Sequence, residues 1–84
     1  MRDAANTIKF RMAWCQRQIA KAHTEAEIDG WCAEEAGLKD ALLNSDHTND
    51  YRHSTPEVFE RYVQGLRDGT ALIQVARVYL RHPG

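Results

Sequence analysis

The chain has 84 residues, of which 43% are hydrophobic, and its formal net charge is −1. This length suits one small domain over residues 1–84, and the ordinary apolar content argues against disorder. No apolar run is long enough to span a membrane, and two cysteines are too few for a secreted disulfide framework, so we expect a cytoplasmic protein without a membrane partner.

Charge is divided along the chain into three blocks. Residues 1–23 hold five basic side chains and one acidic one, whereas residues 24–60 hold ten acidic and two basic ones. Residues 61–84 are basic again, with four basic side chains and one acidic one. Neighbouring helices commonly alternate in charge, so we interpret the middle block as an acidic helix between two basic ones. The alternative is an acidic ridge that binds a basic partner.

A first helix is predicted over residues 4–22. Its apolar side chains recur at steps of three and four residues, which places them on one face of a helix. No glycine or proline interrupts residues 1–29, so nothing in this stretch opposes helix formation. The apolar face consists of Ala5, Ile8, Met12, Cys15, Ile19 and Ala22.

Two large aromatic residues, Phe10 and Trp14, fall on the other side of this helix together with Arg17 and Lys21. Such a mixture is typical of the centre of a protein-binding surface, and aromatic side chains on a basic face can also stack on single-stranded nucleic acid. The simpler interpretation, favoured by so small a core, is that the C-terminal helix packs on these aromatic side chains and buries them.

A second helix is predicted over residues 25–43. Thr24 and Glu27 form a capping-box pattern at its start, and an apolar face follows. Glu35 and Lys39 project onto the middle of that face if the helix is unbroken. Either they pair with each other at the i, i+4 spacing or the helix breaks at Gly37, and we expect a break or bend near Gly37. The apolar face consists of Ile28, Trp31, Cys32, Leu38, Leu42 and Leu43.

The two helices are expected to fold back on each other at His23–Thr24, as an antiparallel hairpin over residues 4–43. Residues whose numbers sum to about 47 then face each other, which pairs Cys15 with Cys32. We interpret this facing thiol pair as two small buried side chains in a reducing cell, with a disulfide as the alternative.

Residues 44–54 are polar and show no periodicity, so we predict a loop. The two histidines of this loop, His47 and His53, lack the tight spacing of structural zinc ligands. Its acidic residues follow the spacing of a calcium-binding EF-hand, but Tyr51 stands where the turn requires glycine. We therefore predict no metal site and no cofactor.

A C-terminal helical segment is predicted over residues 55–81, with Ser54 or Thr55 as its cap and Pro56 in its first turn. Its apolar residues follow a heptad-like seam. Such a seam is typical of packing against another helix, and we expect it to support a homodimer. The seam consists of Phe59, Tyr62, Leu66, Ile73, Ala76 and Leu80.

Gly69 leaves two possibilities for this segment. It is either one helix, or a helix pair in which Gly69 ends the first helix and Thr70 caps the second. The pair would resemble a helix-turn-helix, with Gln74, Arg77 and Arg81 facing nucleic acid as a thin basic footprint.

These elements predict an all-α fold, a small bundle of three or four helices built on the N-terminal hairpin. The sequence has no nucleophile elbow, phosphate-binding glycine loop or HExxH pattern, so we expect no enzyme. We expect a protein–protein interaction module that inhibits or adapts a host protein, with a small nucleic-acid-binding regulator as the alternative. Residues Ile19–Trp31 are similar to helical tails of phage recombination proteins, which implies a phage or mobile-element origin.

Overall fold

The computed structural model describes the backbone of residues 4–81 and the side chains of residues 4–77. It contains four helices: α1 (Ala4–Lys21), α2 (Glu25–Leu43), α3 (Thr48–Tyr51) and α4 (Pro56–Arg81). There is no strand among the described residues, so the prediction of an all-α fold is confirmed. None of these helices combines the length and the apolar character that a membrane crossing requires.

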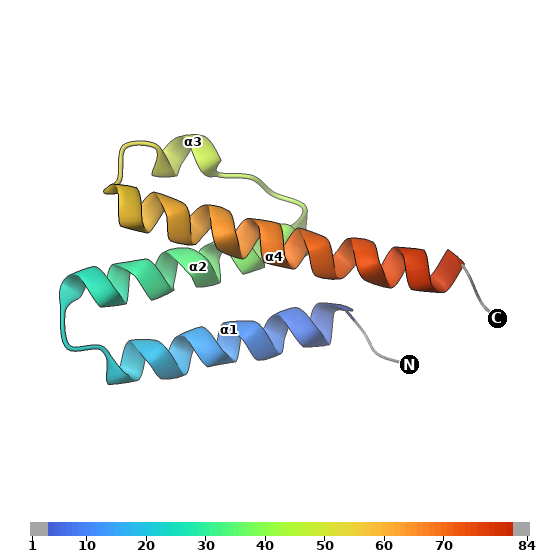
Figure 1. The fold of residues 1–84 in the computed structure, drawn as a ribbon, viewed down its shortest axis with the longest axis horizontal. Coiled ribbons are helices and arrows are strands. Elements are labelled where there is room, and N and C mark those ends of the chain that lie inside the picture. Colours follow the sequence, from blue (N-terminus) through green and yellow to red (C-terminus); the bar gives the residue numbers. More distant parts are fainter. Residues whose placement is uncertain (1–3, 82–84) are drawn as a thin grey trace.

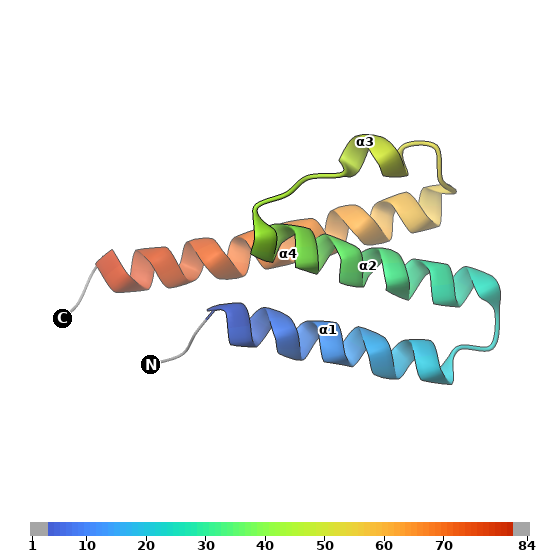
Figure 2. The same ribbon diagram turned by 180° about the vertical axis from the view of Figure 1, so that it is seen from behind.

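The three long helices lie side by side, with α2 between α1 and α4 (Figure 1). α1 and α2 form the predicted antiparallel hairpin, whereas α4 runs parallel to α2 because the linker between them returns along the bundle (Figure 2). The contacts follow the same parallel order, since Glu34 lies beside Gly65 and Ala41 lies beside Gly69. The result is an elongated molecule of 48 × 27 × 15 Å.

Both ends of α2 are capped. The Glu27 N–H donates to the Thr24 hydroxyl oxygen (3.1 Å), as the capping box predicts. The Glu27 carboxylate accepts from the His23 N–H (3.2 Å), one residue earlier than in the usual box. At the other end Asn44 takes the left-handed conformation (φ 56°), and its N–H donates to the Ala41 carbonyl (3.3 Å).

The predicted break at Gly37 is wrong, because α2 continues through this residue to Leu43. Gly37 is buried against α4, where a Cβ atom would overlap the Tyr62 carbonyl oxygen. Gly65 of α4 is its counterpart, since a Cβ atom there would overlap the Glu34 carbonyl oxygen. The two glycines allow the backbones of α2 and α4 to touch.

Of the two possibilities left open at Gly69, the structure shows the single helix, because α4 is one helix of 26 residues. A Cβ atom on Gly69 would lie 2.5 Å from the Ala41 Cβ, so this glycine serves the same close packing. With no turn at Thr70, the two-helix arrangement that a helix-turn-helix requires does not exist.

Few apolar side chains are completely buried. The core cluster consists of Ile8 and Cys15 from α1 and Leu38 from α2, each with 0% exposure. Further apolar side chains pack around this cluster and are partly buried: Met12, Trp31, Leu42, Leu72 and Ile73. A core of this size supplies little hydrophobic stabilisation. Close backbone packing and hydrogen bonds between the helices therefore contribute a large share of the stability of the fold.

Residues 44–54 are predicted as a loop, but this linker contains the short helix α3. The Asp46 carboxylate forms an Asx turn just before this helix, because it accepts both the Thr48 N–H (2.8 Å) and the Thr48 hydroxyl. Asp46 is thus held within its own turn instead of facing an ion. No group of three or more potential metal ligands comes together within the described side chains.

Candidate interaction surface

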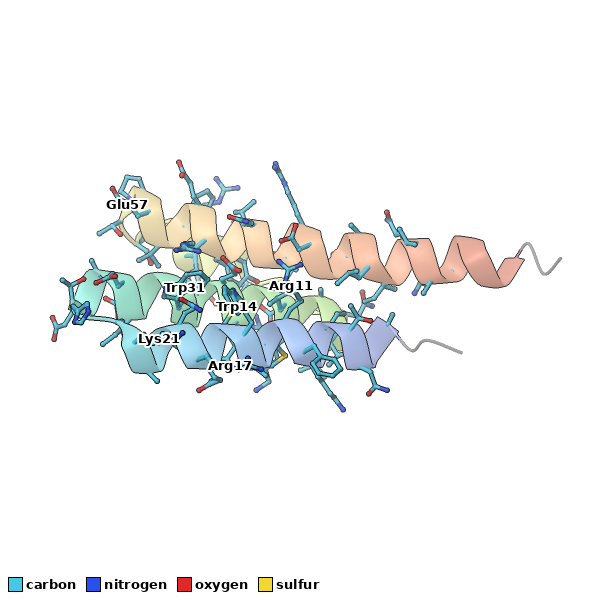
Figure 3. All side chains as sticks on the ribbon, turned by 60° about the horizontal axis from the view of Figure 1, so that its bottom comes forward. Arg11, Trp14, Arg17, Lys21, Trp31 and Glu57 are labelled. Atoms are coloured by element: carbon cyan, nitrogen blue, oxygen red, sulfur yellow. The ribbon has the colours of Figure 1, made fainter. Side chains whose placement is uncertain are left out.

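The four residues predicted as an interaction surface are all exposed and lie on one face of α1. We call Phe10, Trp14, Arg17 and Lys21 the α1 stripe. Phe10 is 74% exposed and Trp14 is 47% exposed, so the interpretation that the C-terminal helix buries them is wrong. Figure 3 shows Arg17 and Lys21 on α1, and Trp14 on the edge of α1 toward Trp31.

The stripe is exposed because α1 packs with its opposite face. Ile8 and Cys15 enter the core between α1 and α2, and Met12 packs beside them. On the side of α1 that faces α4, Arg11 forms an ion pair with Asp68 (3.0 Å). Since α4 lies mainly along α2, it leaves the outer side of α1 uncovered.

The α1 stripe carries positive charge that no ion pair among the described residues neutralises. The sequence of α1 contains no aspartate or glutamate. Arg11 is paired with Asp68, whereas Lys9, Arg17 and Lys21 have no ion-pair partner within the described residues. Two exposed aromatic rings therefore stand on a face with unpaired cations.

A buried charge cluster lies where α1, α2 and α4 meet. Glu34 is only 3% exposed, and its carboxylate accepts from Arg61 (2.8 Å). The Arg61 guanidinium also lies over the Trp31 ring, with its central carbon 3.9 Å from the ring centroid. The Cys15 thiol is the third neighbour, at 3.9 Å from the other Glu34 carboxylate oxygen. Sequence analysis missed this cluster, because its members come from three helices without a common spacing.

The predicted facing thiol pair is wrong, because Cys15 is buried and Cys32 is exposed. Cys15 faces Glu34, and the Gln16 side-chain amide donates to the Glu35 carboxylate (2.6 Å). The numbers of these facing residues add up to 49 and 51 instead of about 47, so the hairpin is offset by two to four residues from the predicted register. α2 turns one side to α1 and another to α4, and Cys32 occupies the side that remains.

Both thiols are shifted away from reactivity at neutral pH. Burial, followed by the nearby Glu34 carboxylate, raises the pKa of Cys15 to about 11. Burial, followed by Glu35 and Asp29, also raises the pKa of Cys32. Because the thiolate is the nucleophile, neither residue has the environment of a catalytic cysteine.

The predicted dimer seam is largely used within the chain. Tyr62 has 0% exposure, and the Leu66 backbone lies against Gly37. Ile73 packs on the core cluster, while Phe59 and Ala76 are half-buried in the monomer. The side chain of Leu80 lies outside the described residues. Tyr62 in particular is closed to a second chain, so it is not part of a dimer seam.

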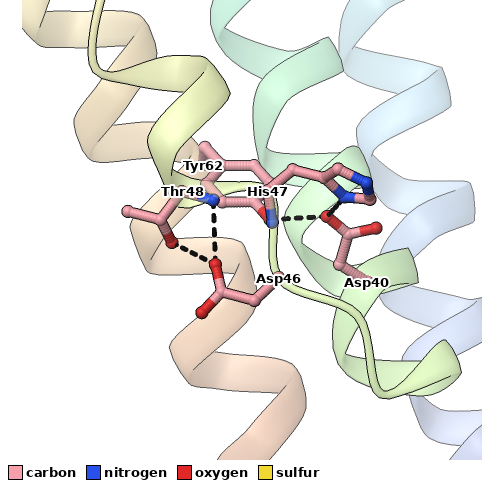
Figure 4. A network of polar contacts seen from close by, with 5 residues as sticks. All are labelled: Asp40, Asp46, His47, Thr48 and Tyr62. Carbon is pink, nitrogen blue, oxygen red and sulfur yellow. Dashed lines mark hydrogen bonds and ion pairs between the residues drawn. The ribbon is translucent and has the colours of Figure 1, made fainter.

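Tyr62 instead belongs to a polar network that joins α2, the linker and α4 (Figure 4). The Tyr62 hydroxyl donates to the Asp40 carboxylate (2.5 Å) and accepts from the His47 N–H (2.7 Å). The His47 ring nitrogen Nδ1 also bonds the same Asp40 oxygen (2.8 Å). Tyr51 of α3 stacks on the Tyr62 ring, with the centroids 4.2 Å apart.

The electrostatics of this network favour a structural tie. Burial and the bond to Asp40 raise the pKa of Tyr62 to about 12, so its hydroxyl keeps its proton at neutral pH. The bond to Asp40 raises the pKa of His47, which favours the charged imidazolium beside the carboxylate. Sequence analysis assigns no role to His47 beyond the polar loop, because its partners lie seven and fifteen positions away.

No protein-family model, curated protein or solved structure matches this chain. The role of the surface therefore has to follow from its own residues. Two surfaces are available for binding: the exposed, positively charged α1 stripe and the side of α2 that neither α1 nor α4 covers.

Proposed function

We propose that this protein is a non-catalytic protein–protein interaction module and that the α1 stripe is its binding surface. The observation that carries the proposal is the exposure of Phe10 (74%) beside Trp14 on a helix without a single carboxylate. Large aromatic side chains that stay exposed next to arginine are typical of binding hot spots. An adaptor or an inhibitor of a host protein fits this arrangement.

The chemistry of the stripe favours a helical, acidic partner. Its residues follow steps of four, three and four, which is the spacing that presents one seam to another helix. A partner helix with apolar side chains opposite Phe10 and Trp14 and carboxylates opposite Arg17 and Lys21 would complement it.

Parallel affinity capture from a lysate of the source organism tests the proposal. The double variant Phe10→Ser, Trp14→Ser is compared with the wild type and with Val75→Ser, a matched control at a residue that is 66% exposed on α4. We expect the captured protein to be lost about 10-fold or more in the double variant and kept in the control, with the helical circular dichroism unchanged in both.

Equal capture by all three proteins would contradict the proposal. If the bound material disappears on nuclease treatment and binding to duplex DNA weakens steeply with salt, the nucleic-acid alternative replaces it.

A further inference from the structure

The outer face of α2 carries a second stripe with the same helical spacing. Its residues follow steps of four, three, four, three and four along the side of α2 that neither α1 nor α4 covers. All are exposed except Ala36, which is half-buried, and Leu43 is 60% exposed. We call this set the α2 stripe; it consists of Glu25, Asp29, Cys32, Ala36, Lys39 and Leu43.

Hollows on both sides make the α2 stripe a ridge that another helix can straddle. A hollow of about 320 Å³ lies on the α1 side and is lined by Met12, Ala36 and Lys39 among others. A second hollow of about 640 Å³ lies on the linker side, where Ala36 and Leu43 meet Tyr51. Large side chains from a docking helix would find space in both.

The two stripes are complementary when their helices run antiparallel. The α1 stripe is aromatic at its start and cationic at its end. The α2 stripe is anionic at its start, with Glu25 and Asp29, and its other end consists of Ala36, Lys39 and Leu43. Antiparallel docking therefore brings the cationic end of the α1 stripe against the anionic end of the α2 stripe, with Lys21 opposite Asp29. In the same register Phe10 lies opposite Lys39, where an aromatic ring can accept the ammonium group over its face.

Resting on the proposed role of the α1 stripe, we infer that a second copy of this chain is one of its partners, and that the α1 stripe of one copy docks antiparallel on the α2 stripe of the next. Arg17 then lies opposite Cys32, and Trp14 lies opposite Ala36, where its ring has room. The contact is heterologous, so a pair of copies keeps one free α1 stripe and one free α2 stripe, and association continues head to tail or closes into a ring.

Charge reversal on each stripe tests the contact. Arg17→Glu, Lys21→Glu makes both stripes acidic, and Glu25→Lys, Asp29→Lys makes both basic, so each double variant should repel itself. An equimolar mixture restores opposite charges across the contact. Sedimentation velocity of the full chain should show association of the wild type at about 0.1 mM, weakened at least 10-fold by raising salt to about 0.5 M.

The same measurement should show each variant as a monomer alone and association in the mixture. Arg67→Glu, Arg77→Glu, at two exposed residues of α4, is the control and should associate like the wild type at low salt. Recovery in the mixture also separates loss of contact from misfolding, because two misfolded chains would not restore each other.

A cysteine placed on the α1 stripe tests the register. Arg17→Cys should form a disulfide with Cys32 of another copy under mild oxidation and give a ladder of multimers on a non-reducing gel. Ala20→Cys, exposed on α1 but off the stripe, and Arg17→Cys combined with Cys32→Ser should not.

A wild type that stays monomeric at about 0.1 mM in low salt overturns the inference, as does a mixture that fails to associate. If aromatic-dependent capture of another protein persists in that case, the proposed function stands and only self-association is lost. If self-association is found but capture does not depend on Phe10 and Trp14, the partner role is restricted to a second copy.

Discussion

At the scale of single residues, the Tyr62 hydroxyl holds three segments together. Replacing it in Tyr62→Phe leaves the His47 N–H without its acceptor and the Asp40 carboxylate, 9% exposed, with one donor fewer. We expect the free energy of unfolding to fall by about 1–3 kcal/mol. A buried polar group that is left unpaired still carries the cost of its removal from water, but no longer has the hydrogen bond that offset this cost. Urea unfolding measures this change.

Tyr51→Phe is the matched control for this prediction. It keeps the ring that stacks on Tyr62 and removes only a hydroxyl for which the structure shows no hydrogen bond. We expect its unfolding midpoint to match the wild type. If Tyr62→Phe is as stable as this control, the network does not tie the linker to the bundle.

Individual contacts were the part least accessible from sequence. Periodicity places Phe10 and Trp14 on one face of a helix, but whether that face is covered depends on where α4 lies. Cys32 illustrates the same problem. It is exposed because α1 and α4 pack on other sides of α2, and the sequence does not show which sides these are. The bond between Asp40 and Tyr62 has no local signal at all, because it joins residues 22 positions apart.

At the scale of elements, the glycines at the α2–α4 contact are the decisive residues. Gly65→Ala would drive a Cβ atom into the Glu34 carbonyl oxygen, so the helices must separate. We expect it to lower the free energy of unfolding by about 1–3 kcal/mol. Gly30→Ala is the control, because its Cβ atom would meet only the Arg61 side chain at 3.6 Å. That change should stabilise the protein by about 0.5–1 kcal/mol through helix propensity.

Thermal or urea unfolding of the two alanine variants, followed by circular dichroism, gives both values. Similar effects of the two substitutions would mean that helix propensity alone governs these positions and that the close approach of α2 and α4 contributes nothing.

Helix starts were predictable where the cap chemistry is local. Thr24 and Glu27 are three residues apart, and the hairpin follows from the periodicity on both sides of them. Gly37 was misinterpreted and Gly69 was left open because a glycine that ends a helix and a glycine that lets two helices touch look alike in one sequence. Only the residue on the neighbouring helix distinguishes them.

At the scale of the whole molecule, the two cysteines report on different events. Cys32 is exposed in the folded chain, whereas Cys15 lies in the core between α1 and α2. We expect a thiol reagent in excess to modify one cysteine per chain quickly and the second only when the bundle opens. Since burial, followed by Glu35 and Asp29, raises the pKa of Cys32, the rate at which the exposed thiol reacts should increase above neutral pH.

Counting modified thiols by mass spectrometry, with and without denaturant, checks this expectation. Cys32→Ser should leave a native protein that reacts only slowly, and its rate should follow the population of the unfolded state. Fast modification of that variant would mean that α1 detaches from α2 without global unfolding.

The parallel course of α2 and α4 could not be predicted, because it depends on how far a polar linker returns along the bundle. It has a mechanical consequence. The first turn of α1 and the last turn of α4 lie at the same end of the molecule (Figures 1 and 2). Tension between the two chain ends would therefore peel α1 and α4 away from α2 one turn at a time, instead of shearing whole helices past each other. A machine that pulls this chain from its ends would thus meet little resistance.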